Sequence, residues 1–195
     1  MPTVVLRPSS EISSGNWDDS ATSGSFDVAK INDSDNSTYV NNSTQNQSFI
    51  VHLDDTSGLS GATFNNFVVT AIFQKHGGRG ADASFEVKIG DASSVTTFGN
   101  ISDSVFVTTN SSATTINANS INFGGSVSAS DVDDMRLSVT TTDGTQVRIF
   151  ELYVTVDYTA AATGYTHDVI GVAAASIGKI NTVATANVGK MNSVD

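Results

Sequence analysis

The sequence of 195 residues contains no cysteine. Disulfide frameworks, zinc sites built from thiolates and cysteine nucleophiles are therefore excluded. Histidine is nearly as scarce, with only His52, His76 and His167. A histidine-rich metal site would need all three to converge from distant parts of the chain. We therefore expect surface histidines, no bound metal and no cofactor.

Basic residues are also few, with 9 Lys and Arg against 20 Asp and Glu and a formal net charge of -11. This charge would repel the phosphates of nucleic acids and the surface of anionic membranes. No window holds the roughly 18 apolar residues that span a bilayer, and residues 1–8 lack the basic and apolar parts of a secretory signal. We expect no nucleic-acid partner, no membrane partner and synthesis in the cytoplasm.

Motifs of common enzyme classes are missing as well. The sequence has no GxSxG nucleophile elbow, no phosphate-binding loop and no dinucleotide fingerprint. Adjacent aspartates occur at residues 18–19, 54–55 and 133–134. Glycoside hydrolysis needs two carboxyl groups about 5 to 9.5 Å apart across a sugar, which neighbouring loop residues rarely provide. We predict that the protein is not an enzyme, and a sandwich-type hydrolase is the weaker alternative.

Two aspartate-rich segments, residues 33–36 and 131–134, loosely resemble calcium-binding loops. Calcium takes roughly six to eight oxygen ligands, and loops often supply them. Neither segment has the full EF-hand pattern with its distal glutamate, and aspartate is also an ordinary turn former. We predict turns at both segments, with calcium as the alternative.

Residues 3–158 have the composition of strands and turns, with short runs of Val, Ile, Phe and Thr separated by Gly, Asn, Asp and Ser. In three segments, apolar and polar residues alternate, which predicts strands with one buried face. The predicted inward residues are Phe49, Val51 and Leu53; Phe85, Val87 and Ile89; and Met135, Leu137 and Val139. Strand-helix alternation is absent, so the pattern predicts an all-β fold of two packed, mainly antiparallel sheets.

Two longer segments complete this body. Residues 64–74 are the longest apolar run, and their aromatic and β-branched content favours a central strand over a buried helix. The glycines of residues 77–80 then predict a hairpin tip. In residues 146–158, the sequence places Phe150, Leu152, Val154 and Val156 on one face. The other face is mixed in character, which predicts a strand covered on both sides.

After Tyr158 the composition changes abruptly to a small-residue linker, so we predict a sandwich over residues 1–158 and a linker and tail over 159–195. In the tail, residues 177–183 recur as residues 188–194, with glycine, lysine, asparagine and the final valine identical. The apolar steps of three fit neither a helix nor a half-buried strand, so the tail lacks an obvious way to bury them alone. An extended tail that docks on a partner is predicted, with a frayed end or packing on its own domain as alternatives. The predicted contact residues are Ile177, Gly178, Ile180, Val183, Val188, Gly189, Met191 and Val194.

Three aromatic residues are candidates for stacking on the face of a sugar. They are Trp17, Tyr39 and Tyr153. Trp17 follows a Gly-Asn turn, and its competing role is to close one end of the sandwich. These residues are the basis for a lectin-like alternative function.

Three segments of the body form a set. They are residues 14–17, which end in Trp17; residues 29–40, which end in Thr-Tyr-Val; and residues 148–158, which read Arg-Ile-Phe-Glu-Leu-Tyr-Val-Thr-Val-Asp-Tyr. The set resembles virion structural proteins of tailed bacteriophages, in which such motifs frame a jelly-roll sandwich. The tail units resemble repeats near the ends of phage particle proteins, although those often have Asn-Gly where this chain has Asn-Thr and Asn-Ser. The resemblance implies a jelly roll over about residues 14–158 and no catalytic residue.

We therefore expect a non-enzymatic structural component of a phage particle, such as a capsid decoration or cement-type protein or a neck or tail accessory protein. Its C-terminal tail would anchor it to other virion proteins, and further copies would form a trimer or ring. It would be located in the virion. The alternative is a carbohydrate-binding module, such as a receptor-binding fibre domain, whose ligand is a host glycan.

Overall fold

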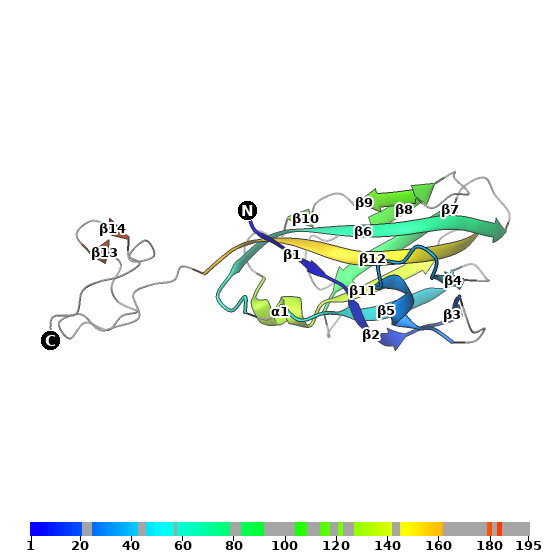
Figure 1. Ribbon diagram of the computed structural model, residues 1–195, viewed down its shortest axis with the longest axis horizontal. Coiled ribbons are helices and arrows are strands. Elements are labelled where there is room, and N and C mark those ends of the chain that lie inside the picture. Colours follow the sequence, from blue (N-terminus) through cyan, green and yellow to red (C-terminus); the bar gives the residue numbers. More distant parts are fainter. Residues whose placement is uncertain are drawn as a thin grey trace. The chain divides into compact units, whose positions relative to one another are not determined.

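In the computed structural model, the chain forms two compact units, Met1–Thr159 and Ala160–Asp195. The structure describes residues 1–20, 25–42, 46–56, 58–78, 83–91, 104–108, 114–117, 121–122, 127–141, 145–161, 179–180 and 183–184. The first unit is built almost entirely from β-strands (Figure 1). Among the described residues, no helix is long and apolar enough to cross a membrane.

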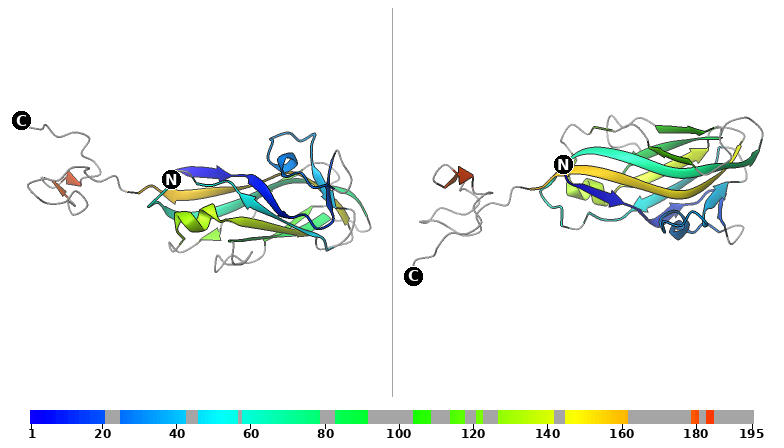
Figure 2. Two further views of the ribbon diagram at one scale, coloured as in Figure 1. Left: turned by 90° about the horizontal axis from the view of Figure 1, so that it is seen from below. Right: turned by 45° about the horizontal axis from the view of Figure 1, so that its top comes forward.

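The larger sheet of the first unit has seven strands in its described part. Its main path is β10 (Ile121–Asn122), β6 (Thr63–Gly78), β12 (Thr145–Thr159), β4 (Val40–Asn42) and β3 (Trp17–Asp19). In addition, β1 (Thr3–Leu6) pairs with β12, and β9 (Thr114–Asn117) pairs with β6. The long strands β6 and β12 run side by side through its centre (Figures 1 and 2). Residues 64–74 therefore form a strand, as predicted.

The smaller sheet has five strands, in the order β2 (Pro8–Ser13), β5 (Ser48–Leu53), β11 (Arg136–Thr141), β7 (Ala83–Gly90) and β8 (Ser104–Thr108). Every strand pair given for the two sheets is antiparallel. The described helices are one 3-10 turn, η1 (Val28–Ile31), and one short helix, α1 (Ala129–Asp133). The prediction of an all-β, jelly-roll-like sandwich of two antiparallel sheets is confirmed.

The core lies between the two sheets and contains the alternating residues that the sequence indicated. Phe49, Val51 and Leu53 of β5 are fully buried, whereas the residues that alternate with them, Ser48, Ile50 and His52, are partly exposed. Val87 and Ile89 of β7 are buried in the same core, as are Met135, which directly precedes β11, and Leu137 and Val139 of β11. The side chain of Phe85, which was also predicted to face inward, lies outside the described part of the structure. Burying an aliphatic or aromatic side chain contributes roughly 1.5–3 kcal/mol each, so this core is the main source of stability.

A β-bulge interrupts the alternation of β12. The register shifts between Ile149, which faces Phe73, and Glu151, which faces Ile72. Ile149 and Leu152 both belong to the core, whereas Phe150 does not. The prediction that Phe150 shares a face with Leu152 is therefore wrong, because the bulge adds one residue to β12 and reverses the orientation of the side chains before it. Phe150 and Glu151 are nevertheless only 6% and 3% exposed, so this part of β12 is covered on both faces.

Residues 129–133 form the helix α1 and not the turn that was predicted. Ser128 caps the helix, because its hydroxyl accepts a hydrogen bond from the Asp131 backbone N–H and the Asp131 carboxylate accepts one from the Ser128 backbone N–H. This reciprocal arrangement satisfies two backbone donors at the start of the helix. Val132 of this helix is buried and anchors the helix to the core.

In the second unit, β13 (Lys179–Ile180) and β14 (Val183–Ala184) form a short antiparallel pair. Ile180 lies opposite Val183 in this pair. Both had been predicted as anchors for a partner surface. The other predicted anchors, Ile177, Gly178, Val188, Gly189, Met191 and Val194, lie outside the described residues. Docking of the tail stays a prediction.

Candidate functional site

A pocket of about 200 Å³ lies at the outer face of the larger sheet. It is lined by Arg7, Ser34, Asn36, Ile72, Glu151 and Tyr153. Ile72 and Glu151 are register partners on β6 and β12. Since Leu152 and Val154 face the core, Glu151 and Tyr153 lie on the opposite side of β12. The bulge at Phe150 therefore places a glutamate and a tyrosine side by side on the outside of the sandwich.

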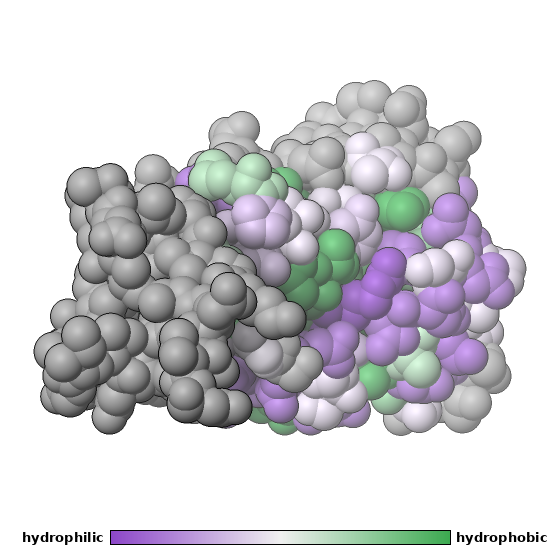
Figure 3. Space-filling view, turned by 60° about the vertical axis from the view of Figure 1, so that its left-hand side comes forward, coloured by the Kyte–Doolittle hydropathy of each residue, from purple (hydrophilic) through white to green (hydrophobic). Residues whose placement is uncertain are grey.

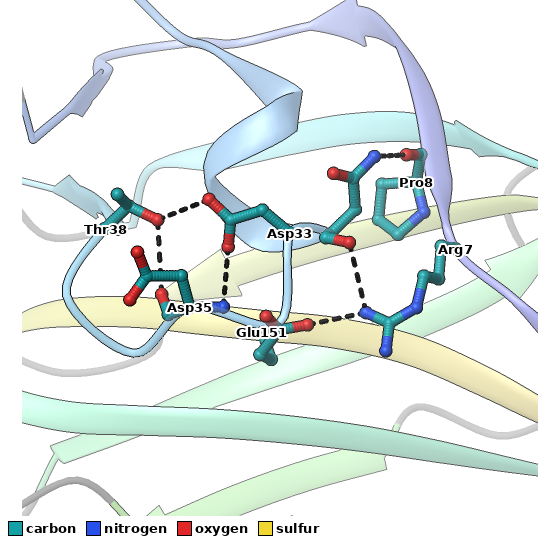
Figure 4. Close-up of polar contacts among 7 residues, drawn as sticks. Arg7, Pro8, Asp33, Asp35, Thr38 and Glu151 are labelled. Atoms are coloured by element: carbon teal, nitrogen blue, oxygen red, sulfur yellow. Dashed lines mark hydrogen bonds and ion pairs between the residues drawn. The ribbon is translucent and has the colours of Figure 1, made fainter.

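Arg7 enters the pocket from the point where the chain passes from one sheet to the other. It lies between β1, which belongs to the larger sheet, and β2, which belongs to the smaller sheet. Its Nη1 atom donates to Glu151 Oε2 at 2.6 Å and to the backbone oxygen of Asn32 at 3.3 Å. Figure 4 shows Arg7 between Glu151 and the segment that follows η1. The ion pair joins residues 144 positions apart in the sequence.

The two side chains of this ion pair differ in their exposure to solvent. The Glu151 side chain is 4% exposed, whereas that of Arg7 is 31% exposed. Glu151 Oε1 is buried and has no hydrogen-bond partner among the described residues. A buried carboxylate loses its hydration and depends on its partners for compensation. Arg7 is thus the cation that compensates the buried Glu151 side chain.

The loop after η1 forms one wall of the pocket and is held by its own polar side chains. The Asp33 carboxylate accepts hydrogen bonds from the Asp35 backbone N–H at 2.9 Å and from the Thr38 hydroxyl at 2.7 Å (Figure 4). Asn32 Nδ2 donates to the backbone oxygen of Pro8 at 2.6 Å, which ties the loop to the start of β2. These are aspartate and asparagine turns of the ordinary kind, as the sequence predicted for residues 33–36.

Two further features hold this loop in position. Ser34 has a φ of 60°, in the left-handed region that non-glycine residues seldom occupy. The carboxylate of Asp35 accepts a hydrogen bond from the Ser37 backbone N–H at 2.8 Å. The hydrogen bonds from Ser37 and the nearby charge of Lys30 lower the pKa of Asp35. Ser34 and Asn36, which face the pocket, are therefore presented by a pre-shaped turn.

Tyr153 provides the aromatic wall. Its ring is half-buried, and the Arg7 guanidinium lies over it at 5.2 Å from the ring centroid. The pocket thus combines an aromatic ring, an aliphatic side chain, a hydroxyl, an amide and an ion pair. Such a set can hold a small polar ligand through directed hydrogen bonds and apolar contact.

The three aromatic residues predicted for sugar stacking do not come together. Trp17 is 2% exposed, packs edge-on against Phe49 at 4.9 Å and donates Nε1–H to the Gln47 backbone oxygen. Its ring face is therefore part of the core and not a sugar platform. Tyr39 packs against Phe150 at 5.6 Å and lies under the Arg148 guanidinium at 4.4 Å. Of the three, only Tyr153 lines the pocket.

Sequence reasoning missed Arg7, Ser34, Asn36 and Glu151 as site residues. The aspartate-rich loop was visible as a motif, and Glu151 stood within the closing-strand motif, but nothing near Arg7 indicated its distant partner. In the part of the chain that the structure describes, no three His, Cys, Asp or Glu side chains are grouped in a way that could hold a metal ion.

The surface outside this pocket offers little continuous apolar area in the described residues. Large hydrophobic side chains that are exposed there are Met1, Val5 and Ile12. On the face seen in Figure 3, the green hydrophobic areas are small and are interrupted by purple hydrophilic residues. Scattered exposed apolar residues of this kind are normal for protein surfaces. The polar pocket is therefore the stronger candidate for a binding site.

Comparisons with known proteins found solved structures that are similar to this chain in fold alone. No protein-family model matches the chain, and no curated protein matches it. One similar solved structure is the C-terminal CBM6 of LamC, a marine laminarinase from Zobellia galactanivorans, with a TM-score of 0.42 and 9% identity over 80% of this chain and 98% of that one. Another is the CBM32 of AlyQ in complex with 4,5-unsaturated mannuronic acid, with a TM-score of 0.39 and 14% identity over 75% of this chain and 98% of that one. At these scores and identities, neither neighbour identifies a shared site or ligand.

Proposed function

We propose that the β-sandwich is a non-catalytic carbohydrate-binding module and that the pocket beside Tyr153 is its binding site. The observation that supports this most directly is the set of groups in one pocket: the Tyr153 ring, the Arg7–Glu151 pair, and the polar side chains of Ser34 and Asn36. A sugar has apolar C–H faces and polar hydroxyl edges. Aromatic rings suit the former, and paired donors and acceptors suit the latter.

The size of the pocket limits the ligand. Pockets for drug-sized ligands measure about 300–1,000 Å³, and this pocket of about 200 Å³ is smaller. A single sugar ring or the end of a glycan chain fits this scale better than an internal stretch of a polysaccharide. The pocket would then read a terminal residue, as a receptor-binding domain does when it recognises the ends of surface glycans.

The same geometry argues for binding without hydrolysis. Glycosidases place two carboxyl groups about 5 to 9.5 Å apart across the scissile bond. Glu151 is the only carboxylate among the pocket-lining residues, and Arg7 holds one of its oxygens. Among the described residues, the lining of the pocket therefore offers no second carboxylate for acid-base catalysis.

A glycan array followed by calorimetry with the best ligand tests this function. Tyr153→Ala should weaken binding at least about fivefold, because stacking and aromatic burial contribute about 1–3 kcal/mol. Tyr39→Ala is the matched control, since Tyr39 is also half-buried beneath an arginine but does not line the pocket. A blank array, or equal loss in both variants, would reject the proposed site.

We further propose that this binding module is a component of a phage particle. Its support is the resemblance of residues 14–17, 29–40 and 148–158 to virion structural proteins and the repeat in residues 177–183 and 188–194. A receptor-binding fibre domain satisfies both proposals. Partner docking through the tail, a trimer or ring, and location in the virion are parts of this proposal.

Electron microscopy of native particles, together with a truncated chain, tests the virion proposal. A chain that ends at Ala161 keeps the whole of β12, which pairs with β6 as far as Thr159. It should fold and bind glycan but fail to enter particles. Normal incorporation of the truncated chain would reject the docking role of the tail.

A further inference from the structure

The charges around the pocket favour one class of sugar over another. Arg7 is the only cationic residue that lines the pocket, and its Nη1 atom is already bound to Glu151 Oε2 and to a backbone oxygen. Glu151 contributes a full negative charge, and its Oε1 atom has no donor among the described residues. The ion pair therefore leaves little uncompensated positive charge for an anionic ligand.

The neighbouring loop adds further negative charge. Asp33 and Asp35 flank Ser34, which lines the pocket, and both carboxylates accept hydrogen bonds within the loop. The hydrogen bonds from Ser37 lower the pKa of Asp35, so this group is ionised at neutral pH. Lys30 is the cation that acts on Asp35. The three carboxylates of Glu151, Asp33 and Asp35 therefore outnumber the two cations, Arg7 and Lys30.

We propose that the pocket binds uncharged sugar residues and rejects their acidic counterparts. This inference depends on the carbohydrate-binding function proposed above and adds the class of sugar. The carboxylate of a uronic acid that bound the other N–H donors of Arg7 would share the guanidinium with Glu151, whose Oε2 atom lies 2.6 Å from Nη1. Two carboxylates would then compete for one guanidinium, and the 4% exposed Glu151 would lose part of the compensation that Arg7 provides. Specificity of this kind comes from a repulsive group as well as from attractive contacts.

Matched sugar pairs provide the test on the unaltered protein. Methyl galactoside with methyl galacturonide, and the glucose and mannose equivalents, differ only in a hydroxymethyl or a carboxylate group at one carbon. For the pair whose neutral member binds, calorimetry should show the acidic member binding at least about tenfold more weakly, which corresponds to about 1.4 kcal/mol. The ratio of the neutral to the acidic sugar's affinity should shrink as the salt concentration is raised, because ionic strength screens partly exposed charges.

The substitution Glu151→Gln tests whether Glu151 causes the preference for neutral sugars. Glu151→Gln keeps the size of the side chain and an acceptor for Arg7, but it removes the charge and should bring the neutral-to-acidic ratio close to one or reverse it. Glu11→Gln is the matched control, since Glu11 is exposed on β2 and removes the same charge from the whole protein. The control should leave the ratio unchanged.

The outcomes separate the two proposals. If no member of any pair binds, the carbohydrate-binding function itself is rejected. If sugars bind but acidic members bind as well as or better than neutral ones, the function stands and the preference for neutral sugars is overturned. A ratio that changes equally in Glu151→Gln and Glu11→Gln also overturns it, because net charge and not the pocket would then explain the preference.

Discussion

The ion pair between Arg7 and Glu151 yields the most demanding test of how this site is built. We expect Arg7→Met to destabilise the sandwich by about 2–4 kcal/mol, since methionine retains part of the apolar stem but removes the donor. Breaking a buried pair costs about 3–5 kcal/mol, and the 31% exposure of Arg7 lets water reach part of the site and reduces this cost. Glu151 would be left 4% exposed in the folded protein with neither oxygen bound to a described donor.

The double variant Arg7→Met/Glu151→Leu separates the cost of a stranded charge from the value of the pair. Replacing both members of a buried pair with apolar groups is often close to neutral. We therefore expect the double variant to be more stable than Arg7→Met alone, with a coupling energy of about 1–3 kcal/mol. Glu11→Gln on exposed β2 controls for loss of charge without burial and should change stability by less than about 0.5 kcal/mol.

Urea unfolding measured by tryptophan fluorescence is the suitable assay. The protein has one tryptophan, Trp17, which is 2% exposed against Phe49 and will report loss of the core. With an m-value of about 2 kcal/mol/M, Arg7→Met should lower the urea midpoint by about 1–2 M. A shift below about 0.3 M, or a double variant less stable than Arg7→Met, would show that Glu151 does not depend on Arg7.

Three further predictions concern the fold and the loop. Phe49→Ala should cost about 3–5 kcal/mol in urea unfolding, because Phe49 is fully buried between Trp17 and Phe26, and a cost below about 1 kcal/mol would contradict this packing. Gly15→Ala should lower the free energy of unfolding by at least about 2 kcal/mol, because the φ of Gly15 is 53° and a Cβ atom would lie 2.3 Å from the Ser48 backbone oxygen. Gly58→Ala is the control and should cost only about 1 kcal/mol, because Gly58 has a φ of 82° but open space around it. Equal costs for the two variants would refute the clash at Gly15. The pKa of Asp35 is lowered in the folded protein, so its contribution to stability is present above the usual pKa of about 3.9 and is lost as the pH falls below that value. The difference in unfolding free energy between the parent and Asp35→Asn should therefore shrink between pH 5 and about pH 2. A difference that does not depend on pH would contradict this role of Asp35.

The sequence predicted those parts of the fold that depend on local alternation. In β5, three apolar positions alternate with Ser48, Ile50 and His52, and the two polar residues among these favour one orientation toward a core. In β12, Ile149 and Phe150 are both apolar, so either residue could face inward and the pattern could not locate the bulge. The position of the bulge decides which way Glu151 points, so the sequence pattern could not predict that Glu151 belongs to the site.

The other features that the sequence did not predict have similar physical causes. A tryptophan carries a large apolar surface and one polar atom, so it suits a core or a sugar platform equally well in sequence. Trp17 is in the core because the backbone oxygen of Gln47 satisfies its N–H there. The capping box at Ser128 and Asp131 was a readable local signal, with a polar pair spaced three residues apart before Val132. The Arg7–Glu151 pair had no such local signal, because its members meet only when β1 pairs with β12.

The site depends on two departures from regular sheet structure, the passage of the chain between sheets at Arg7 and the β-bulge at Phe150. Each of them places one member of the ion pair. At Arg7 the chain leaves the larger sheet for the smaller one, which places a cation beside the outer face of β12. At Phe150 the bulge turns Glu151 toward that cation and away from the apolar core. Without Arg7, the bulge would place an uncompensated carboxylate under the loop of residues 33–36; without the bulge, strict alternation would turn Glu151 into the core. The two irregularities together produce a polar pocket on the outer face of the larger sheet. A ligand that enters this pocket meets the Arg7–Glu151 ion pair, so its affinity depends on how it interacts with both charges.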